Sequence, residues 1–557
     1  MPQVICIAVA CLFFWVGIQW IWEHRVGGLL DMDEAGYFGI AVGDYFELTK
    51  NGFLAWLKQV TGPNIQAPLT TALTSLVYAA AGLELHYGYL VPLASATIAI
   101  LAAYWLACEI AGPYAGLGAA ALTATTPLIV IYSRSFHFAM PATALVALAL
   151  LAAVKSDRFS KTGWSIAFGI FLGLLPLART MTIAFIPGIL FGAALNIASS
   201  ASLSGRLIRF VGALGVAAIV SAMWLAFTWK EVGSYLFSFG YGTRAAEYGT
   251  VIPFFSLDTL QRAILLVACS VFLPHLILIA LGLAVMPAVA FHAIRQHGWK
   301  SGTYVANSPL LLLTVTVFCG IAALVSSPNT GSAFIAPLLP PLVVLAVCLA
   351  WQASTLRLYR AAVLFVIVST AIVVGLPFLN IYTLPQGATG VPYLGPVGVS
   401  DNRGTIDIYI DSSGPRAMGR NKADAALWLA VFAETNHAIS ENGESGGVAV
   451  GFRNGIYSVN ALGLQYFLKT RAGRSFILVD PGGTGNTTGG FREWLTNGAA
   501  AHSNLLLTSP GEEGEDFGPP VDYAALEVAA RDVDFLPVDT WTLPNGRVVT
   551  LWKRPKR

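Results

Sequence analysis

The stretch ‘VICIAVACLFFWVGIQWIW’ (Val4–Trp22) is an apolar run without a single charged side chain. A helix of this length can cross a hydrocarbon core about 30 Å thick. No basic segment precedes the run and no small-residue cleavage pattern follows it, so we expect a retained first helix and not a signal peptide. The composition agrees, with 56% hydrophobic and 11% charged residues and a mean hydropathy of +0.67. A soluble domain carries about 25% charged residues. We therefore expect a polytopic α-helical membrane protein.

Apolar segments of spanning length recur along the first 380 residues and predict about 11 transmembrane helices. They lie at about 4–22, 89–110, 114–132, 138–154, 163–178, 181–198, 208–229, 263–290, 308–325, 333–352 and 361–380. The stretch 66–82 is also apolar, but it is short and follows a proline. We expect it to form a partly embedded or juxtamembrane helix.

The basic residues predict the orientation of these spans. They gather in alternate loops, at Lys155, Arg158, Lys161, Arg206, Arg209, Arg295, Lys300, Arg357 and Arg360. The positive-inside rule makes that side cytoplasmic. We expect the N-terminus inside and the C-terminus outside. The long first loop, 23–88, then lies outside.

The composition changes near residue 380. We expect a transmembrane domain over 1–380, a Gly/Pro-rich linker over 381–420 and an extracytoplasmic α/β domain over 421–557. Buried strands are predicted at ‘GGVAVGF’, ‘SFILVD’ and ‘NLLLTS’, in a mainly parallel sheet. ‘FLPVDTWTLPNGRVVTLWKR’ has Asn-Gly between two strand-like runs and predicts a hairpin. We read the last residues, ‘WKRPKR’, as a solvated basic tail, and ‘DPGGTGNTTGGF’ as a flexible turn region and not a P-loop.

Three acids, Asp31, Asp33 and Glu34, stand just beyond the first span. One interpretation is structural, because Asp is a good helix cap and acids favour the first turn of a helix. The other is catalytic, because the acids open a long outer loop at the lipid–water boundary. The residues alone leave both interpretations open.

The order of motifs along the chain resembles the bacterial C-type membrane glycosyltransferases, the aminoarabinose-transferase-like and protein-O-mannosyltransferase-like enzymes. ‘DEAGY’ and then ‘QAPLTTALTSLVYAAAG’ resemble the family's first outer loop. ‘TPLIVIYSRSFHFAMPATALVALALLA’, ‘GIFLGLLPLARTMTIAFIPGIL’ and ‘SSPNTGSAFIAPLLPPLVVLA’ are similar to its later spans, and the final hairpin is similar to that of many outer domains.

The resemblance implies an inverting transfer of a sugar from a polyprenyl-phosphate donor. An acid of the first outer loop would take the proton of the acceptor hydroxyl. By motif position this base is Asp33, with Glu34 as a neighbour or alternate. Tyr37 would pack the loop or donate a hydrogen bond to the substrate.

The departing phosphate needs cationic or hydrogen-bonding groups. Arg134 and Arg179 are the candidates, against the alternative of Arg side chains that snorkel to the interface. Arg244, in the long 230–262 loop, is a further candidate. The chain departs from the family at three points. Gln66 stands where a basic residue is usual, His137 lies where an acid is often found, and Asn329 lies in a segment that lacks the usual Lys or Arg.

We therefore expect an outward-facing glycosyltransferase that acts on a lipid, polysaccharide or protein acceptor. Its partners would be membrane lipid, the lipid-linked sugar and that acceptor, without nucleic acid. The eight histidines show no metal-ligand spacing, and no metal-binding residues are predicted. The acid cluster alone leaves metal dependence open, and no cofactor is predicted apart from the lipid-linked sugar as donor substrate. A transporter or flippase of lipid-linked glycans is the alternative, and so is a non-catalytic relative.

Overall fold

The computed structural model describes most of the N-terminal two thirds of the chain and parts of the remainder. The described residues are 1–26, 32–198, 203–242, 244–245, 253, 256–268, 270–271, 273–297, 308–329, 331–353, 360–361, 363–365, 367–369, 399–401, 404–406, 447–450, 478–479, 484–508, 521–542 and 548–555. The chain divides into two compact units. The first comprises Met1–Ile21, Asp44–Ala81 and Tyr87–Pro415, and the second comprises Trp22–Gly43, Gly82–His86 and Arg416–Arg557.

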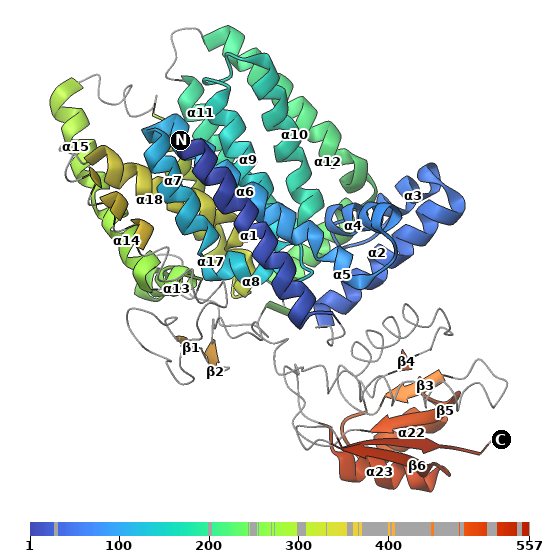
Figure 1. Cartoon of the computed structure of the whole chain (residues 1–557). Helices are drawn as coiled ribbons and strands as arrows, with labels where there is room; N and C mark the ends of the chain where they lie inside the picture. The colour runs from blue at the N-terminus through green and yellow to red at the C-terminus, as the bar shows by residue number, and fades with distance from the viewer. Residues whose placement is uncertain are drawn as a thin grey trace. The chain divides into compact units, whose positions relative to one another are not determined.

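Helices dominate the described residues (Figure 1). In chain order they are α1 (Pro2–His24), α2 (Met32–Asn51), α3 (Phe53–Val60), α4 (Leu69–Ala81), α5 (Leu85–Gly88), α6 (Leu90–Ala111), α7 (Pro113–Ala124), α8 (Pro127–Ser133), α9 (Ala139–Lys155), α10 (Thr162–Ala178), η1 (Thr180–Phe185), α11 (Ile186–Ala198), α12 (Leu203–Gly240), α13 (Leu257–Ala268), α14 (Leu273–Ala284), α15 (Met286–His297), α17 (Pro309–Val325), η4 (Ser332–Phe334), η5 (Ala336–Leu338), α18 (Leu339–Ala353), α22 (Thr488–Thr496) and α23 (Tyr523–Asp532).

Five helical stretches in the described part are long and apolar enough to span a membrane, or six if the bent pair α7–α8 is one span. They include Pro2–Trp22, Leu85–Ala111 and Leu203–Gly240. α9, α10 and α17 are apolar but have 17 residues each. The expected span 263–290 is wrong as one helix, because the chain breaks into α13, α14 and α15 there. Most of the expected span 361–380 lies outside the described residues.

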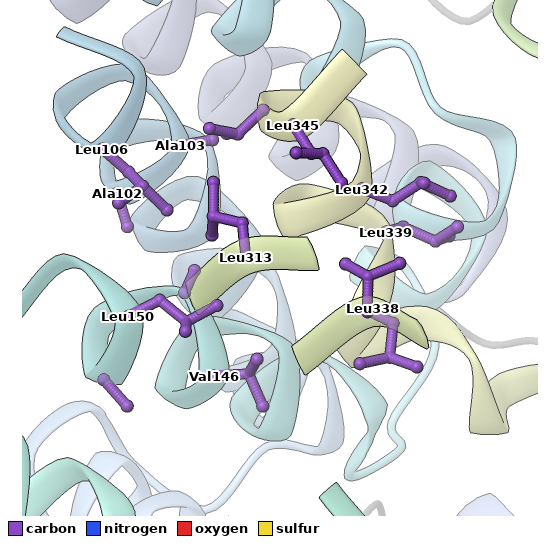
Figure 2. Packing of buried hydrophobic residues seen from close by; sticks show 14 of the residues in the cluster. Ala102, Ala103, Leu106, Val146, Leu150, Leu313, Leu338, Leu339, Leu342 and Leu345 are labelled. Atoms are coloured by element: carbon purple, nitrogen blue, oxygen red, sulfur yellow. The ribbon is translucent and has the colours of Figure 1, made fainter. Parts of the chain in front are cut away.

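The core of the helical unit lies where α6, α9, α17 and α18 meet. Small residues of α6, Ala102 and Ala103, lie beside Leu106, and larger side chains fill the space from the facing helices (Figure 2). These are Val146 and Leu150 of α9, Leu313 of α17, and Leu338, Leu339, Leu342 and Leu345 of η5 and α18. Close packing of this kind, and not exclusion of water, holds helices together in lipid.

Glycine allows α10 and α12 to approach at backbone distance. A Cβ at Gly169 would lie 2.3 Å from the Ala213 carbonyl oxygen, and one at Gly173 would lie 2.6 Å from that of Ala217. The two glycines are four residues apart, on one face of α10, which is the small-xxx-small pattern of packed membrane helices. Ser221 of α12 also donates a hydrogen bond to the Gly173 carbonyl at 2.9 Å.

The long loop 23–88 forms the 20-residue helix α2 and the shorter helices α3, α4 and α5. α4 has 13 residues, about 20 Å at 1.5 Å per residue, so it is too short to cross a bilayer. This agrees with the expectation of a juxtamembrane or partly embedded helix at 66–82. α3 begins after Gly52, whose φ of 88° allows the sharp turn from α2.

The second unit contains a five-stranded sheet in the order β4-β3-β5-β7-β6. Its strands are β3 (Gly447–Val450), β4 (Leu478–Val479), β5 (Ser503–Thr508), β6 (Leu536–Thr542) and β7 (Val548–Lys553). A separate antiparallel pair, β1 (Val399–Asp401) and β2 (Gly404–Ile406), belongs to the first unit. β4, β3 and β5 are parallel, whereas β7 runs antiparallel to both β5 and β6. The predicted strands and final hairpin are confirmed, but the sheet is mixed and not mainly parallel. The sequence also predicts helices at ‘KADAALWLAVFAETNHAI’ (422–439) and ‘GLQYFLKTRAG’ (463–473), and both segments lie outside the described residues.

Two readings of this unit are wrong. The start of ‘WKRPKR’ is not a solvated tail, because Trp552 and Arg554 are buried. The Arg554 guanidinium donates to the carbonyl oxygens of Leu495, Ala501 and Ser503 and so ties β7 to the end of α22. The glycine-rich stretch is not all turn either. Thr487 caps α22 by accepting a hydrogen bond from the Gly490 amide.

Candidate active site

The acid motif opens helix α2. Asp33 is the second residue of this helix; the structure describes its backbone and not its side chain, and Asp31 lies outside the described residues. Glu34 is 1% exposed and forms an ion pair with Arg25, which follows the last residue of α1. Two contacts of 3.4 Å join the guanidinium to the two carboxylate oxygens of Glu34. Both carboxylate oxygens of Glu34 therefore contact the Arg25 guanidinium.

Tyr37 is buried on α2, three residues after Glu34. Further along α2, the structure shows a second buried acid, Asp44, which the sequence analysis missed. Gln59 of α3 donates a hydrogen bond to the Asp44 carboxylate at 3.2 Å, and Thr71 of α4 bonds the same group. Burial raises the pKa of Asp44, and these two hydrogen bonds oppose the rise. Asp44 therefore links α2, α3 and α4 through one carboxylate.

Arg134 follows the last residue of α8, a short helix that is bent by 61° from α7. The break falls at Thr125 and Thr126, because Pro127 lacks the N–H that would continue α7 and its ring excludes a helical residue before it. His275 of α14 contacts the Thr125 hydroxyl at 2.9 Å at this break. The short helix α8 then ends at Arg134, which is 7% exposed. Its guanidinium lies 4.8 Å from the centre of the Trp20 ring of α1.

Arg179 lies at the end of α10, in extended backbone between α10 and η1. It is 4% exposed, and its guanidinium donates a hydrogen bond to the Ala333 carbonyl at 2.8 Å. The rings of Phe138 and Phe334 lie 5.2 Å and 4.6 Å from the guanidinium carbon. A cation between two aromatic faces is stabilised by the ring quadrupoles. Arg179 and Arg134 are buried, so the snorkelling alternative fails for both.

His137 lies between Arg134 and α9. Its Nδ1 accepts a hydrogen bond from the Ala139 amide, the first residue of α9, at 3.1 Å. Burial, together with the charge of Arg179, holds the pKa of His137 well below its usual range. The ring is therefore neutral near pH 7, with its proton on Nε2, because Nδ1 acts as the acceptor.

Asn329 and Arg244 each contact Phe239, near the end of α12. The Asn329 amide donates to the Phe239 carbonyl at 3.3 Å, and the Arg244 guanidinium lies 5.2 Å from the Phe239 ring centre. Asn329 is buried and Arg244 is exposed. The segment 326–334 thus reaches α12 through Asn329 and reaches Arg179 through Ala333 and Phe334.

Gln66 precedes α4. Its neighbour Ala67 packs in one buried cluster with Leu177 of α10 and Trp224 of α12. Leu177 is two residues before Arg179, so the end of α10 that carries Arg179 also contacts the long loop 23–88. The Gln66 side-chain oxygen is buried and has no hydrogen-bond partner among the described residues.

Within the helical unit, the structure brings Arg134, His137 and Arg179 together through the turn Arg134–Phe138. Asn329 precedes Ala333 and Phe334 by a few residues, and its side chain bonds the Phe239 carbonyl of α12. Asp33, Glu34 and Tyr37 belong to the second unit. Among the described residues, no group of three or more His, Cys, Asp or Glu side chains is arranged to hold a metal ion.

Searches with the chain find no matching family model and no curated protein similar in sequence. Solved structures do match over almost the whole chain. ArnT from Cupriavidus metallidurans bound to undecaprenyl phosphate has a TM-score of 0.54 at 14% identity, over 98% of this chain and 97% of that chain. The chain has the C-type membrane glycosyltransferase fold.

A second match extends this result. The archaeal oligosaccharyltransferase AglB from Archaeoglobus fulgidus, in complex with an inhibitory peptide and a dolichol-phosphate, has a TM-score of 0.53 at 12% identity. The match covers 98% of this chain and 74% of that chain. The resemblance predicted from the sequence is thus confirmed for the fold. Identities of 14% and 12% support a shared fold and not a shared activity.

Proposed function

We propose that the chain is an inverting glycosyltransferase of the cytoplasmic membrane. It would move a sugar from a polyprenyl-phosphate donor to a lipid, polysaccharide or protein acceptor on the outer face. The observation that carries this proposal is the buried pair of guanidinium groups, Arg134 and Arg179, at the outer-loop end of the helical unit. Burial strengthens the attraction of a cation for a negative charge, so buried cations are typical of sites that receive an anion.

The proposed donor fits these groups chemically. Charge develops on the phosphate as its bond to the anomeric carbon breaks. Arg179 and Arg134 would stabilise that charge through donors held in place before the reaction. His137, neutral and protonated on Nε2, would add a hydrogen bond without adding charge. The polyprenyl chain would remain in lipid.

Asp33 is the proposed general base. It would accept the proton of the acceptor hydroxyl as that oxygen attacks the anomeric carbon on the face opposite the phosphate, which inverts the configuration. Glu34 is a weaker candidate, because Arg25 holds it in an ion pair. Tyr37 and Gln66 would contact the substrate, and Arg244 and Asn329 would border the acceptor side.

The orientation is part of the proposal. α10 begins after the basic loop Lys155–Lys161 and ends at Arg179, so the two lie at opposite ends of one 17-residue helix. If the basic loop is cytoplasmic, Arg179 and the outer loop face outside. With about 11 spans, the C-terminal α/β unit faces outside as well, where it would help recognise the acceptor.

The test is sugar transfer by the full-length protein in lipid nanodiscs, supplied with a panel of polyprenyl-phosphate sugars and a mixture of acceptors. We expect Asp33→Asn to lower kcat by about 10²–10⁴-fold, the usual contribution of a general base. Asp31→Asn is the matched control, and it should keep wild-type turnover. Undiminished transfer by Asp33→Asn would remove Asp33 from the base role. Movement of the carrier across the bilayer without transfer would favour a flippase.

A further inference from the structure

The ion pair between Arg25 and Glu34 joins two residues that are nine apart in the sequence. Arg25 directly follows α1, and Glu34 lies in the first turn of α2. The side chains of Arg25 and Glu34 are 8% and 1% exposed. Screening by solvent is therefore weak at this pair.

The two contacts between Arg25 and Glu34 fix the orientation of the guanidinium relative to the carboxylate as well as the distance between them. Two guanidinium nitrogens face the two oxygens of one carboxylate, the fork arrangement available to Arg and not to Lys. A single point contact would leave the first turn of α2 free to rotate about it. The fork instead sets both the position and the rotation of that turn.

Stability alone does not explain such a pair. Removing two charges from water costs about as much as their attraction returns, so buried ion pairs are weak evidence for stability. Their better supported role is to select one arrangement of the chain. Asp33 immediately precedes Glu34 in the same helical turn, so an interaction that holds this turn also positions the backbone of Asp33.

We propose that Arg25 is a positioning residue for catalysis, which holds the first turn of α2, and with it Asp33, through its fork with Glu34. The proposal rests on the proposed function of Asp33. A displacement of a catalytic group by about 1 Å costs about 10²-fold in rate, so loosening this turn should lower turnover strongly. Binding of the donor, which we assign to Arg134 and Arg179, should change little.

The experiment compares Arg25→Gln, Arg25→Lys, Glu34→Gln and the double variant Arg25→Gln/Glu34→Gln, in full-length protein in nanodiscs. The readouts are kcat and donor KM for sugar transfer, Tm, and hydrogen exchange of the α2 amides. We expect Arg25→Gln to lower kcat by about 10–100-fold, with KM within about two-fold and faster exchange in the first turns of α2. Lys at position 25 should restore part of the rate. The double variant should lose no more than either single one.

Arg158→Gln is the matched control. Arg158 also pairs with an acid, Asp157, but at 3.8 Å and with side chains 30% and 53% exposed. Its kcat and α2 exchange should match wild type.

Unchanged kcat in Arg25→Gln would overturn the proposal. So would a loss of activity that follows a fall in Tm while α2 exchange stays at the wild-type rate. If the proposed function itself is wrong, the wild type transfers no sugar from any donor. Hydrogen exchange of the α2 amides in Arg25→Gln then still shows whether Arg25 holds α2.

Discussion

The two ends of α10 hold their cations in different ways. Before α10 begins, Lys155 pairs with Glu109 at 2.7 Å, with side chains 26% and 41% exposed. Arg206 and Arg209 donate to backbone carbonyls of the turn Asp157–Phe159. After α10 ends, Arg179 and Arg134 are buried against aromatic rings.

Under the proposed function, the partly exposed cations orient the protein in the membrane, and the buried cations bind the phosphate of the donor. Partly exposed cations keep most of their hydration, so they cost little and record which side of the membrane a loop occupies. Buried cations lose their hydration, which is costly, and they are therefore typical of sites that bind an anion. Substitutions at the two ends of α10 should therefore have effects of different kind and size.

The largest effect is expected at Arg179. Arg179→Gln removes the charge but can still donate to the Ala333 carbonyl, so the fold should survive. We expect kcat for sugar transfer to fall by about 10²–10³-fold, the range for loss of one preorganised donor to a developing anion. Steady-state kinetics of the purified protein measure this. Arg206→Gln, at the other end, should stay within about two-fold of wild type. Equal losses in the two variants would abolish the distinction between the ends.

The next effect concerns the packing that joins the two ends. Gly173→Val would place its Cβ 2.6 Å from the Ala217 carbonyl oxygen, so α10 and α12 must separate. Overpacking of this kind costs about 1–3 kcal/mol. Thermal unfolding in detergent should show a lower Tm. Gly215→Val is the matched control, because a Cβ there meets nothing within 4 Å. A Gly173 variant as stable as the Gly215 variant would contradict the packing described.

A third effect depends on pH. Because the pKa of His137 is lowered in the folded protein, the unfolded chain binds one more proton below about pH 6.5. Stability should therefore fall as the pH drops, by about 1.4 kcal/mol for each pH unit below 6.5 until the folded histidine titrates. His137→Asn should lose less stability than wild type between pH 7 and pH 5. The exposed His502→Asn serves as the control and should follow wild type. Identical slopes for wild type and His137→Asn would contradict the buried neutral histidine.

The smallest effect is expected at Lys155. Lys155→Gln breaks the pair with Glu109, and exposed pairs contribute about 0–1 kcal/mol. Its Tm and turnover should lie close to wild type. A loss as large as that at Arg179 would mean that the basic end also has a role in catalysis.

Hydropathy predicts most of the helices in the described part, because it reports length and apolarity. It does not predict where they break. Segment 263–290 read as one span, although Pro274 and Pro287 stand at the second positions of α14 and α15. Proline at the start of a helix is well tolerated, and a continuous apolar run hides that start. The bend before Pro127 was missed for the same reason.

Part of the candidate site was also accessible from sequence. Arg134 and Arg179 were selected by their places at span ends, and His137 as the residue that stands where the resembling family often has an acid. The structure brings the three together around the turn Arg134–Phe138. The fork between Arg25 and Glu34 could not be predicted from the sequence, because a pair of side chains nine residues apart depends on tertiary packing. Asp44 was accessible in principle. It lies 11 residues after Asp33, about three helical turns, and so falls on the same side of α2.

The most direct test of the account is binding of undecaprenyl phosphate, which is the proposed leaving group and requires no knowledge of sugar or acceptor. Binding to nanodisc-embedded protein can be measured by thermophoresis, with dephosphorylated undecaprenol as the lipid control. We predict specific binding by wild type and a loss of about 10-fold or more in Arg179→Gln, since a charge-assisted phosphate contact contributes about 1.5–3 kcal/mol. Arg206→Gln should bind as wild type does. Equal affinity of wild type and Arg179→Gln, or equal binding of undecaprenol, would contradict the claim that the buried arginine end receives a lipid-linked phosphate.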